Sequence, residues 1–310
     1  ISNAKITEIT YNFIEMDYDS IIEKLKNTEN LPTYDLLIAL EKIILKNDIE
    51  ILIHELAVFL GLSLRFVYSY ENPSIYEDFS YFAFNLKKYL NFQLNFLNVD
   101  AIKDVELPFV LSPGNCLVIE RTEDTLICEH GFDRFKLSVG GFDENVRILK
   151  LNVSKIERKD LYQQSIFRDI AYEIHHNYYD GNKDSLNYFV GKNAFKMFIK
   201  DLGDNSKTFH DMSSLILTET IQNQMTALYG LKVYLLGIYH FLSKDEQKIL
   251  FEGIEALGDS IMFFREFERI SKDALMRNMF NSEIRRRCVN SLKRMVASFE
   301  HFVYILEKFI

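Results

Sequence analysis

The sequence predicts an α+β fold in which helices come first, a small mixed sheet follows, and a long helical region ends the chain. All four prolines lie within the first 113 residues, and none occurs from there to Ile310. Because proline removes a backbone donor and breaks helices, a long proline-free stretch with apolar residues three and four apart is expected to be helical. Before that stretch, several short alternating runs indicate strands.

The length predicts two domains. A chain of 310 residues exceeds the roughly 100–200 residues of a usual single domain. Apolar residues make up 48% and charged residues 26% of the chain, which is typical of a globular protein. We expect an α+β domain at residues 1–154 and an all-helical domain at residues 155–310.

The elements of the first domain follow from periodicity and turn residues. We expect helices at residues 32–47, 48–62 and 76–90, and strands at 63–70, 93–99, 114–121, 125–131, 135–139 and 146–151. From about Lys155 the pattern becomes helical, with helices expected at residues 158–179, 191–204, 212–243, 244–275 and 282–310.

One segment predicts a β-hairpin directly. Phe135–Val139 and Val146–Leu151 are short alternating runs, and the residues between them read Gly-Gly-Phe-Asp-Glu-Asn. Glycine and Asx residues accept the positive φ that tight hairpin turns require. We therefore expect these two runs to pair antiparallel.

Charge and cysteine usage exclude several classes of protein. The net charge of −9 argues against a protein that mainly grips nucleic acid or anionic membranes. The most apolar long stretch, residues 227–242, contains Lys232 and His240 and is shorter than the ~20 residues of a membrane span. Three cysteines without a CxxC spacing predict a reducing compartment. No charged-then-apolar leader is visible at Ile1, so we expect a cytoplasmic protein.

The common catalytic and metal-binding motifs are missing from the sequence. It contains no G-x-S-x-G, no Walker-type loop, no G-x-G-x-x-G and no H-E-x-x-H, because Val58 stands where a second histidine would follow His54 and Glu55. Glu173 and His176 have the spacing of two ligands on one helix face, but a di-metal bundle needs a second such pair. We expect no metal and no cofactor.

Cys116, Cys128 and His130 are the candidates for nucleophilic chemistry, because a thiol with a nearby imidazole is the minimal nucleophilic pair. Cysteine is also one of the most frequently buried side chains, so packing in a strand is favoured over catalysis. Arg285, Arg286 and Arg287 lie on a late helix, where they form a solvated face or contact an anion or a partner.

The order of the runs at residues 32–70, 106–121, 132–149 and 191–202, followed by a long helical tail, resembles the butirosin biosynthesis protein H-like family. The resemblance implies a papain-like N-terminal domain joined to a helical C-terminal domain. It also implies acyl transfer from a carrier protein in natural-product biosynthesis, with an acyl carrier protein or a biosynthetic enzyme as partner.

The positions that match the family's catalytic residues are changed. The family nucleophile is a cysteine at the start of the first helix, where Tyr34 and Asp35 stand here, and Phe135 occupies the position of the family histidine. No acidic partner is evident around residues 150–152. The resemblance therefore implies an acyltransferase-like protein of specialised-metabolite or modified-peptide biosynthesis without that Cys–His pair, or with its chemistry elsewhere.

The alternative is a non-catalytic interaction module that binds a carrier protein or a partner enzyme. A reactive thiol would separate the two interpretations, since only the enzyme requires one. We expect no Cys–His pair within hydrogen-bond reach where the first helix meets the hairpin.

The final helix, at residues 282–309, is expected to be a structural member of the helical domain. Residues three and four apart should face its core, while Arg285, Arg286 and Lys293 should point to solvent. The expected inward residues are Ile284, Val289, Leu292, Met295, Val296, Phe299, Val303 and Leu306.

Overall fold

The computed structural model describes residues 35–68, 79–112, 114–130, 133–139, 142, 145–181, 189–216 and 219–310, with only the backbone of residues 158 and 214–223. The chain forms two compact units: a sheet unit of residues 35–61 and 79–161, and a helical unit of residues 62–68 and 162–310. The α+β class predicted from the sequence is confirmed. Within these ranges no helix has both the length and the apolar character that a membrane crossing requires.

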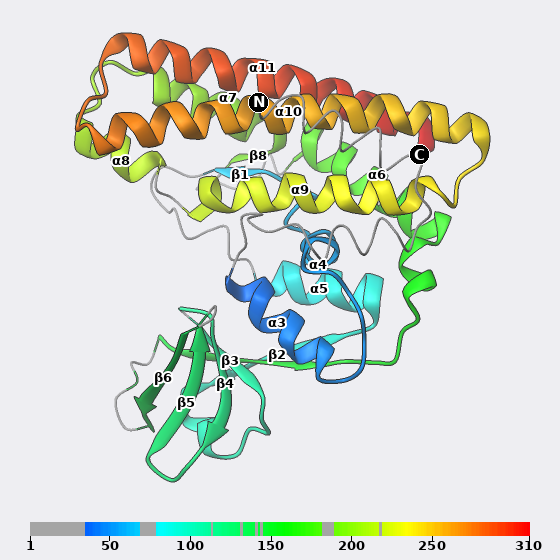
Figure 1. Cartoon of the computed structure of the whole chain (residues 1–310), viewed down its shortest axis with the longest axis vertical. Coiled ribbons are helices and arrows are strands. Elements are labelled where there is room, and N and C mark those ends of the chain that lie inside the picture. Colours follow the sequence, from blue (N-terminus) through cyan, green and yellow to red (C-terminus); the bar gives the residue numbers. More distant parts are fainter. Residues whose placement is uncertain are drawn as a thin grey trace. The chain divides into compact units, whose positions relative to one another are not determined.

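The sheet unit contains one six-stranded antiparallel sheet in the order β2-β7-β3-β4-β5-β6. Its strands are β2 (Gln93–Asn98), β3 (Phe109–Ser112), β4 (Cys116–Arg121), β5 (Thr125–His130), β6 (Asp133–Ser138) and β7 (Arg147–Asn152). Its helices are α3 (Asp35–Leu45), α4 (Ile53–Phe59) and α5 (Phe79–Leu90), with 3₁₀ turns η2 (Val99–Lys103) and η4 (Arg158–Tyr162). Figure 1 colours these elements from blue to green.

The hairpin predicted between residues 135–139 and 146–151 is wrong. Both segments are strands, but β6 pairs with β5, whereas β7 lies between β2 and β3. Only two residues separate β5 from β6, and eight separate β6 from β7. Closing the shorter loop costs less entropy, and β7 gains a paired strand on each side.

The core of the sheet unit lies on the face that carries Phe109, Leu111, Val118, Leu126 and Cys128. The turn η2 packs against it through Ile102, which is also buried. A β-bulge between Val118 and Glu120 shifts the register of β4. Arg121, beyond the bulge, donates to the backbone carbonyls of Ile102 and Val105 and so ties η2 to the sheet.

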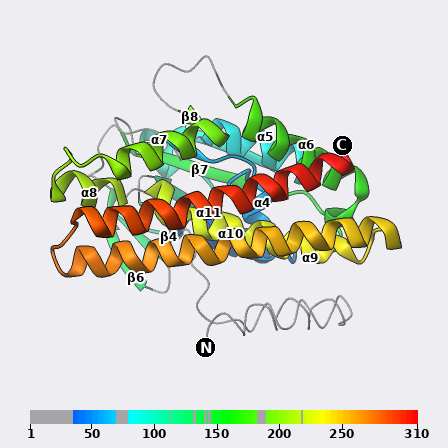
Figure 2. The same cartoon turned by 90° about the horizontal axis from the view of Figure 1, so that it is seen from above.

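The helical unit is built around two long helices, α10 (Lys244–Met276) and α11 (Ser282–Leu306). They lie side by side along their lengths in both views (Figures 1 and 2). The other helices are α6 (Gln164–Tyr179), α7 (Gly191–Gly203), α8 (Phe209–Ile216) and α9 (Glu219–Tyr239), and the turn η5 (Glu307–Phe309) follows α11. Helix α9 packs on α10, while α6 and α7 pack on α11. The prediction of a helical region after about residue 155 is confirmed.

Residues 62–68 join the helical unit through a two-stranded sheet. Strand β1 (Val67–Tyr68) pairs antiparallel with β8 (Phe189–Val190), and the Gly191 amide donates to the Phe66 carbonyl at 2.7 Å. Gly191 has φ +60, and an added Cβ would meet the backbone of Asn177 and Tyr178, so the position requires glycine. The sequence predicted one domain boundary, after residue 154, and the chain passes from the sheet unit to the helical unit between residues 161 and 162. The sequence did not predict that residues 62–68 belong to the helical unit.

Helix α11 buries part of the expected face. Leu292, Met295, Phe299, Val303 and Leu306 are buried, but Ile284, Val289 and Val296 are only half-buried. Arg286 and Lys293 are exposed as expected. The expectation for Arg285 is wrong, because its side chain is 6% exposed. The buried stripe runs through Arg285, Cys288, Ser291 and Phe302, so the helix is rotated relative to the expected face.

Candidate functional site

The candidate site begins with an ion pair between the first described helix and the sheet. Asp35 opens α3, and His130 is the last residue of β5. The His130 Nε2 and Asp35 Oδ2 atoms are 3.0 Å apart, with both side chains close to half exposed. Asp35 lies in the first turn of α3, where the helix dipole favours an acidic side chain.

A second ion pair holds the same helix along the same strand. Lys42 Nζ lies 2.7 Å from Glu129 Oε2, and Glu129 precedes His130 in β5. Residues 35 and 42 are seven apart and therefore share one face of α3. The two pairs together fix where the start of α3 meets the end of β5, which positions the Asp35 carboxylate.

Cys116 lies across from His130 on the neighbouring strand. Strands β4 and β5 pair Val118 with Cys128 and Leu117 with Glu129, so the same register sets Cys116 opposite His130. Opposite residues on an antiparallel pair point to the same face, with Cβ atoms about 4.5–5.5 Å apart. The thiol and the imidazole therefore lie on one face of the sheet.

The thiol of Cys116 is placed by the turn that precedes β4. Gly114 and Asn115 have φ of +98 and +48, a left-handed conformation that glycine and asparagine tolerate. The Cys116 Sγ atom donates to the Gly114 carbonyl at 3.4 Å, and the side chain is partly exposed. Neither Cys116 nor Cys128 makes a hydrogen bond to His130 in the part of the chain described here.

The two thiols of the sheet differ in accessibility. Cys128 is fully buried in the core, and burial, together with the nearby Cys116, raises the pKa of its thiol to about 11. Burial raises the pKa of the Cys116 thiol as well, and the Asp35 carboxylate adds to this effect. Both thiols are therefore protonated at neutral pH, and only Cys116 is open to a reagent.

The Asp35 contact determines which nitrogen of His130 can act as a base. If the Nε2–H donates to the carboxylate, the Nδ1 atom of a neutral imidazole carries the lone pair. A thiol, an imidazole and a carboxylate in this order are what nucleophilic catalysis requires: a nucleophile, a base and a group that orients the base. Asp35 is therefore a positioning residue for His130.

Of the remaining positions from the family resemblance, Phe135 contributes no ionisable group. Tyr34 lies outside the described residues. Phe135 is paired with Cys128 across β5 and β6 and packs against the core of the sheet. Sequence reasoning named Cys116, Cys128 and His130 by their proximity. It named Asp35 only as a position where the resembled family has its nucleophile, and it did not connect Asp35 with His130.

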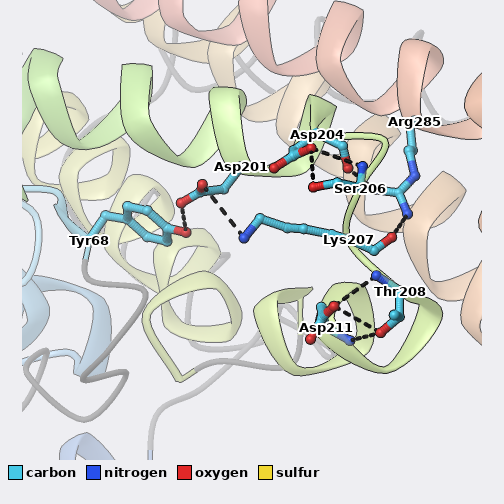
Figure 3. Close-up of polar contacts among 8 residues, drawn as sticks. All are labelled: Tyr68, Asp201, Asp204, Ser206, Lys207, Thr208, Asp211 and Arg285. Carbon is cyan, nitrogen blue, oxygen red and sulfur yellow. Dashed lines mark hydrogen bonds and ion pairs between the residues drawn. The ribbon is translucent and has the colours of Figure 1, made fainter.

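The basic helix residues do not form one exposed cluster. Figure 3 shows that Arg285 reaches the connection between α7 and α8, where its guanidinium donates to the carbonyls of Asp204 at 2.7 Å and Lys207 at 2.6 Å. Arg285 is therefore a structural residue, whereas Arg286 and Arg287 are exposed. Nearby, Tyr68 donates to Asp201 at 2.7 Å.

Among the residues whose placement is described, no three His, Cys, Asp or Glu side chains lie close enough together to hold a metal ion. The candidate pair Glu173 and His176 lies on α6, where His176 Nδ1 is 3.4 Å from Asp180 Oδ2.

No family model and no curated protein matches the sequence. The functional interpretation therefore depends on the geometry of the site and on the sequence resemblance alone.

Proposed function

We propose that the sheet unit is a papain-like acyltransferase unit whose nucleophile is Cys116, with His130 as its base and Asp35 as the residue that orients the base. The observation that carries this proposal is the Asp35–His130 contact of 3.0 Å beside a partly exposed thiol in the opposite register position. The start of the first helix and a strand histidine meet, as in the resembled family, but the thiol comes from the sheet.

The proposed reaction is transfer of an acyl group from a thioester. The Cys116 sulfur attacks the carbonyl carbon while its proton moves to His130 Nδ1. The donor's C–S bond then breaks, and the leaving thiolate takes the proton from His130. In the second half of the reaction, an amine or alcohol acceptor attacks the carbonyl carbon of acyl-Cys116 while its proton passes to His130. The C–S bond to Cys116 then breaks, and the Cys116 thiolate takes that proton.

The raised pKa of Cys116 determines how His130 must act. A pre-formed thiolate would need a lowered pKa, and the surroundings of Cys116 shift it upward. His130 therefore removes the proton during the attack and does not hold a standing ion pair. From the sequence resemblance, we propose a carrier-protein thioester as donor and a specialised metabolite or modified peptide as product.

Intact-mass analysis after incubation with the acetyl thioester of N-acetylcysteamine tests this function. We expect one acetyl adduct in the native chain and in Cys128→Ala, and none in Cys116→Ser. His130→Ala should slow adduct formation by about 10²-fold or more, and Asp35→Asn should slow it less. If no adduct forms, or if the native chain and His130→Ala form it at the same rate, the non-catalytic interaction module becomes the better interpretation.

A further inference from the structure

The face of the sheet that carries Cys116 continues as an apolar surface toward the edge strand β6. The registers place Cys116, His130 and Asp133 in one row across β4, β5 and β6, because His130 pairs with Asp133. The next row on the same face is Val118, Cys128 and Phe135, and Leu126 with Leu137 follows. One polar row therefore borders a continuous apolar region.

This apolar region is closed over β4 and β5 and open over β6. Val118, Leu126 and Cys128 are fully buried, whereas the residues toward the edge are only partly buried while packing on the same core. We call these partly buried residues the apolar shelf: Phe135, Leu137, Val139, Phe142 and Val146.

The charges of β6 lie on its other face. Side chains alternate along a strand, so Arg134 and Lys136 point away from the shelf, and Arg134 forms an ion pair with Glu120. The charged groups at the near end of the shelf, Asp35 and Asp133, are carboxylates. A ligand on the shelf that carries a negative charge would meet repulsion there and no cation among the shelf residues.

We propose that the apolar shelf binds the aliphatic chain of the acyl group that is transferred through Cys116, so that the preferred substrates are medium-chain fatty acyl thioesters. This inference rests on the proposed function. A thioester carbonyl at Cys116 can extend its chain along the polar row toward Phe135 and Leu137, the nearest apolar side chains of this face that are partly open to solvent. Phe135 then sets acyl specificity at the position where the resembled family has its histidine.

Binding of a non-reactive analogue tests the shelf without requiring catalysis. N-acetyl-N′-octanoylethylenediamine, in which an amide replaces the thioester, is titrated into the Cys116→Ser variant by calorimetry. Phe135→Ala and Leu137→Ala should each weaken binding at least about fivefold, since each buried methylene contributes about fourfold to affinity. Lys136→Ala, on the opposite face of the same strand, is the matched control and should leave the affinity unchanged. The unfolding temperature of each variant shows whether it has kept its fold. Because two shelf residues are substituted separately, the test can still be read if one of these variants does not fold.

Acylation rates of the native chain then separate the two proposals. We expect the octanoyl thioester of N-acetylcysteamine to acylate Cys116 at least about tenfold faster than the acetyl thioester, with this preference lost in Phe135→Ala. If acylation depends on His130 but not on chain length, and the amide fails to bind, the shelf inference is wrong and the proposed function stands. If the amide binds through Phe135 but Cys116 is never acylated, the shelf stands and the acyltransferase does not.

Discussion

His54 makes the stability of the sheet unit sensitive to acid. It lies on α4 with 6% of its surface exposed, and its Nδ1 atom has no hydrogen-bond partner among the described residues. Burial lowers the pKa of this imidazole from 6.5 to about 4. Between pH 6.5 and about pH 4, His54 therefore binds a proton in the unfolded chain but not in the folded chain.

We predict that the free energy of unfolding is highest above about pH 6.5 and falls as the pH decreases toward about 4. The contribution of His54 to this loss is about 3 kcal/mol, because one unit of pKa corresponds to ~1.4 kcal/mol. Urea unfolding at pH 7 and pH 5 should show about 2 kcal/mol of this loss, because the rest falls below pH 5. The dependence on pH should shrink in His54→Gln and persist in His301→Gln, a control at an exposed histidine. Equal slopes for all three chains would exclude this role of His54.

Arg285 is buried and its neighbour Arg286 is exposed, so we predict that their removal affects stability to different extents. Removing the Arg285 guanidinium leaves the carbonyls of Asp204 and Lys207 without these two donors, and a hydrogen bond from a charged group contributes about 1.5–3 kcal/mol. We expect Arg285→Ala to lower the free energy of unfolding by about 3 kcal/mol. Arg286→Ala should change it by less than about 0.5 kcal/mol, as measured by chemical denaturation. Similar losses for both variants would refute the buried role of Arg285.

At the scale of elements, α11 is held by aromatic packing. Phe299 is 6% exposed, and its ring centroid lies 5.6–6.0 Å from those of Tyr178, Phe195 and Phe302. We predict that Phe299→Ala destabilises the protein by about 3–5 kcal/mol, the usual range for a buried phenylalanine. Tyr304→Ala, at a position 55% exposed on the same helix, is the control and should have little effect. A small change for Phe299→Ala would show that α11 is not part of the core.

The helices and most strands could be predicted because their signals are local. The spacing of Leu36, Leu40 and Ile43 defines α3, and the Ser243–Glu246 capping box at the start of α10 is a sequence motif. The pairing of strands could not be predicted, since alternation identifies a strand without naming its neighbour. Strand β3 was not predicted because its four residues are all buried and do not alternate.

At the scale of the whole molecule, the sequence indicated a helical C-terminal region but not the route of the chain. Residues 62–68 belong to the helical unit although they lie between two segments of the sheet unit. Their strand β1 pairs with β8, more than a hundred residues further along the chain, and no local pattern encodes such a pairing. The contact between Asp35 and His130 likewise joins residues that are far apart in the sequence. The site's members could be named from the sequence, but their arrangement required the fold.

The pH dependence of Cys116 acylation tests the central claim, that Cys116 and His130 act as a nucleophile and its base, most directly. Acylation by an N-acetylcysteamine thioester is followed by intact mass from pH 5 to 9 in the native chain and in His130→Ala. Because burial and Asp35 raise the pKa of the Cys116 thiol, the variant without the base should react in proportion to a small thiolate fraction that rises steadily with pH. In the native chain, where His130 takes the thiol proton during the attack, the rate should depend less steeply on pH than in the variant and should exceed it by about 10²-fold at pH 7. Parallel profiles with equal rates at pH 7 would contradict the account.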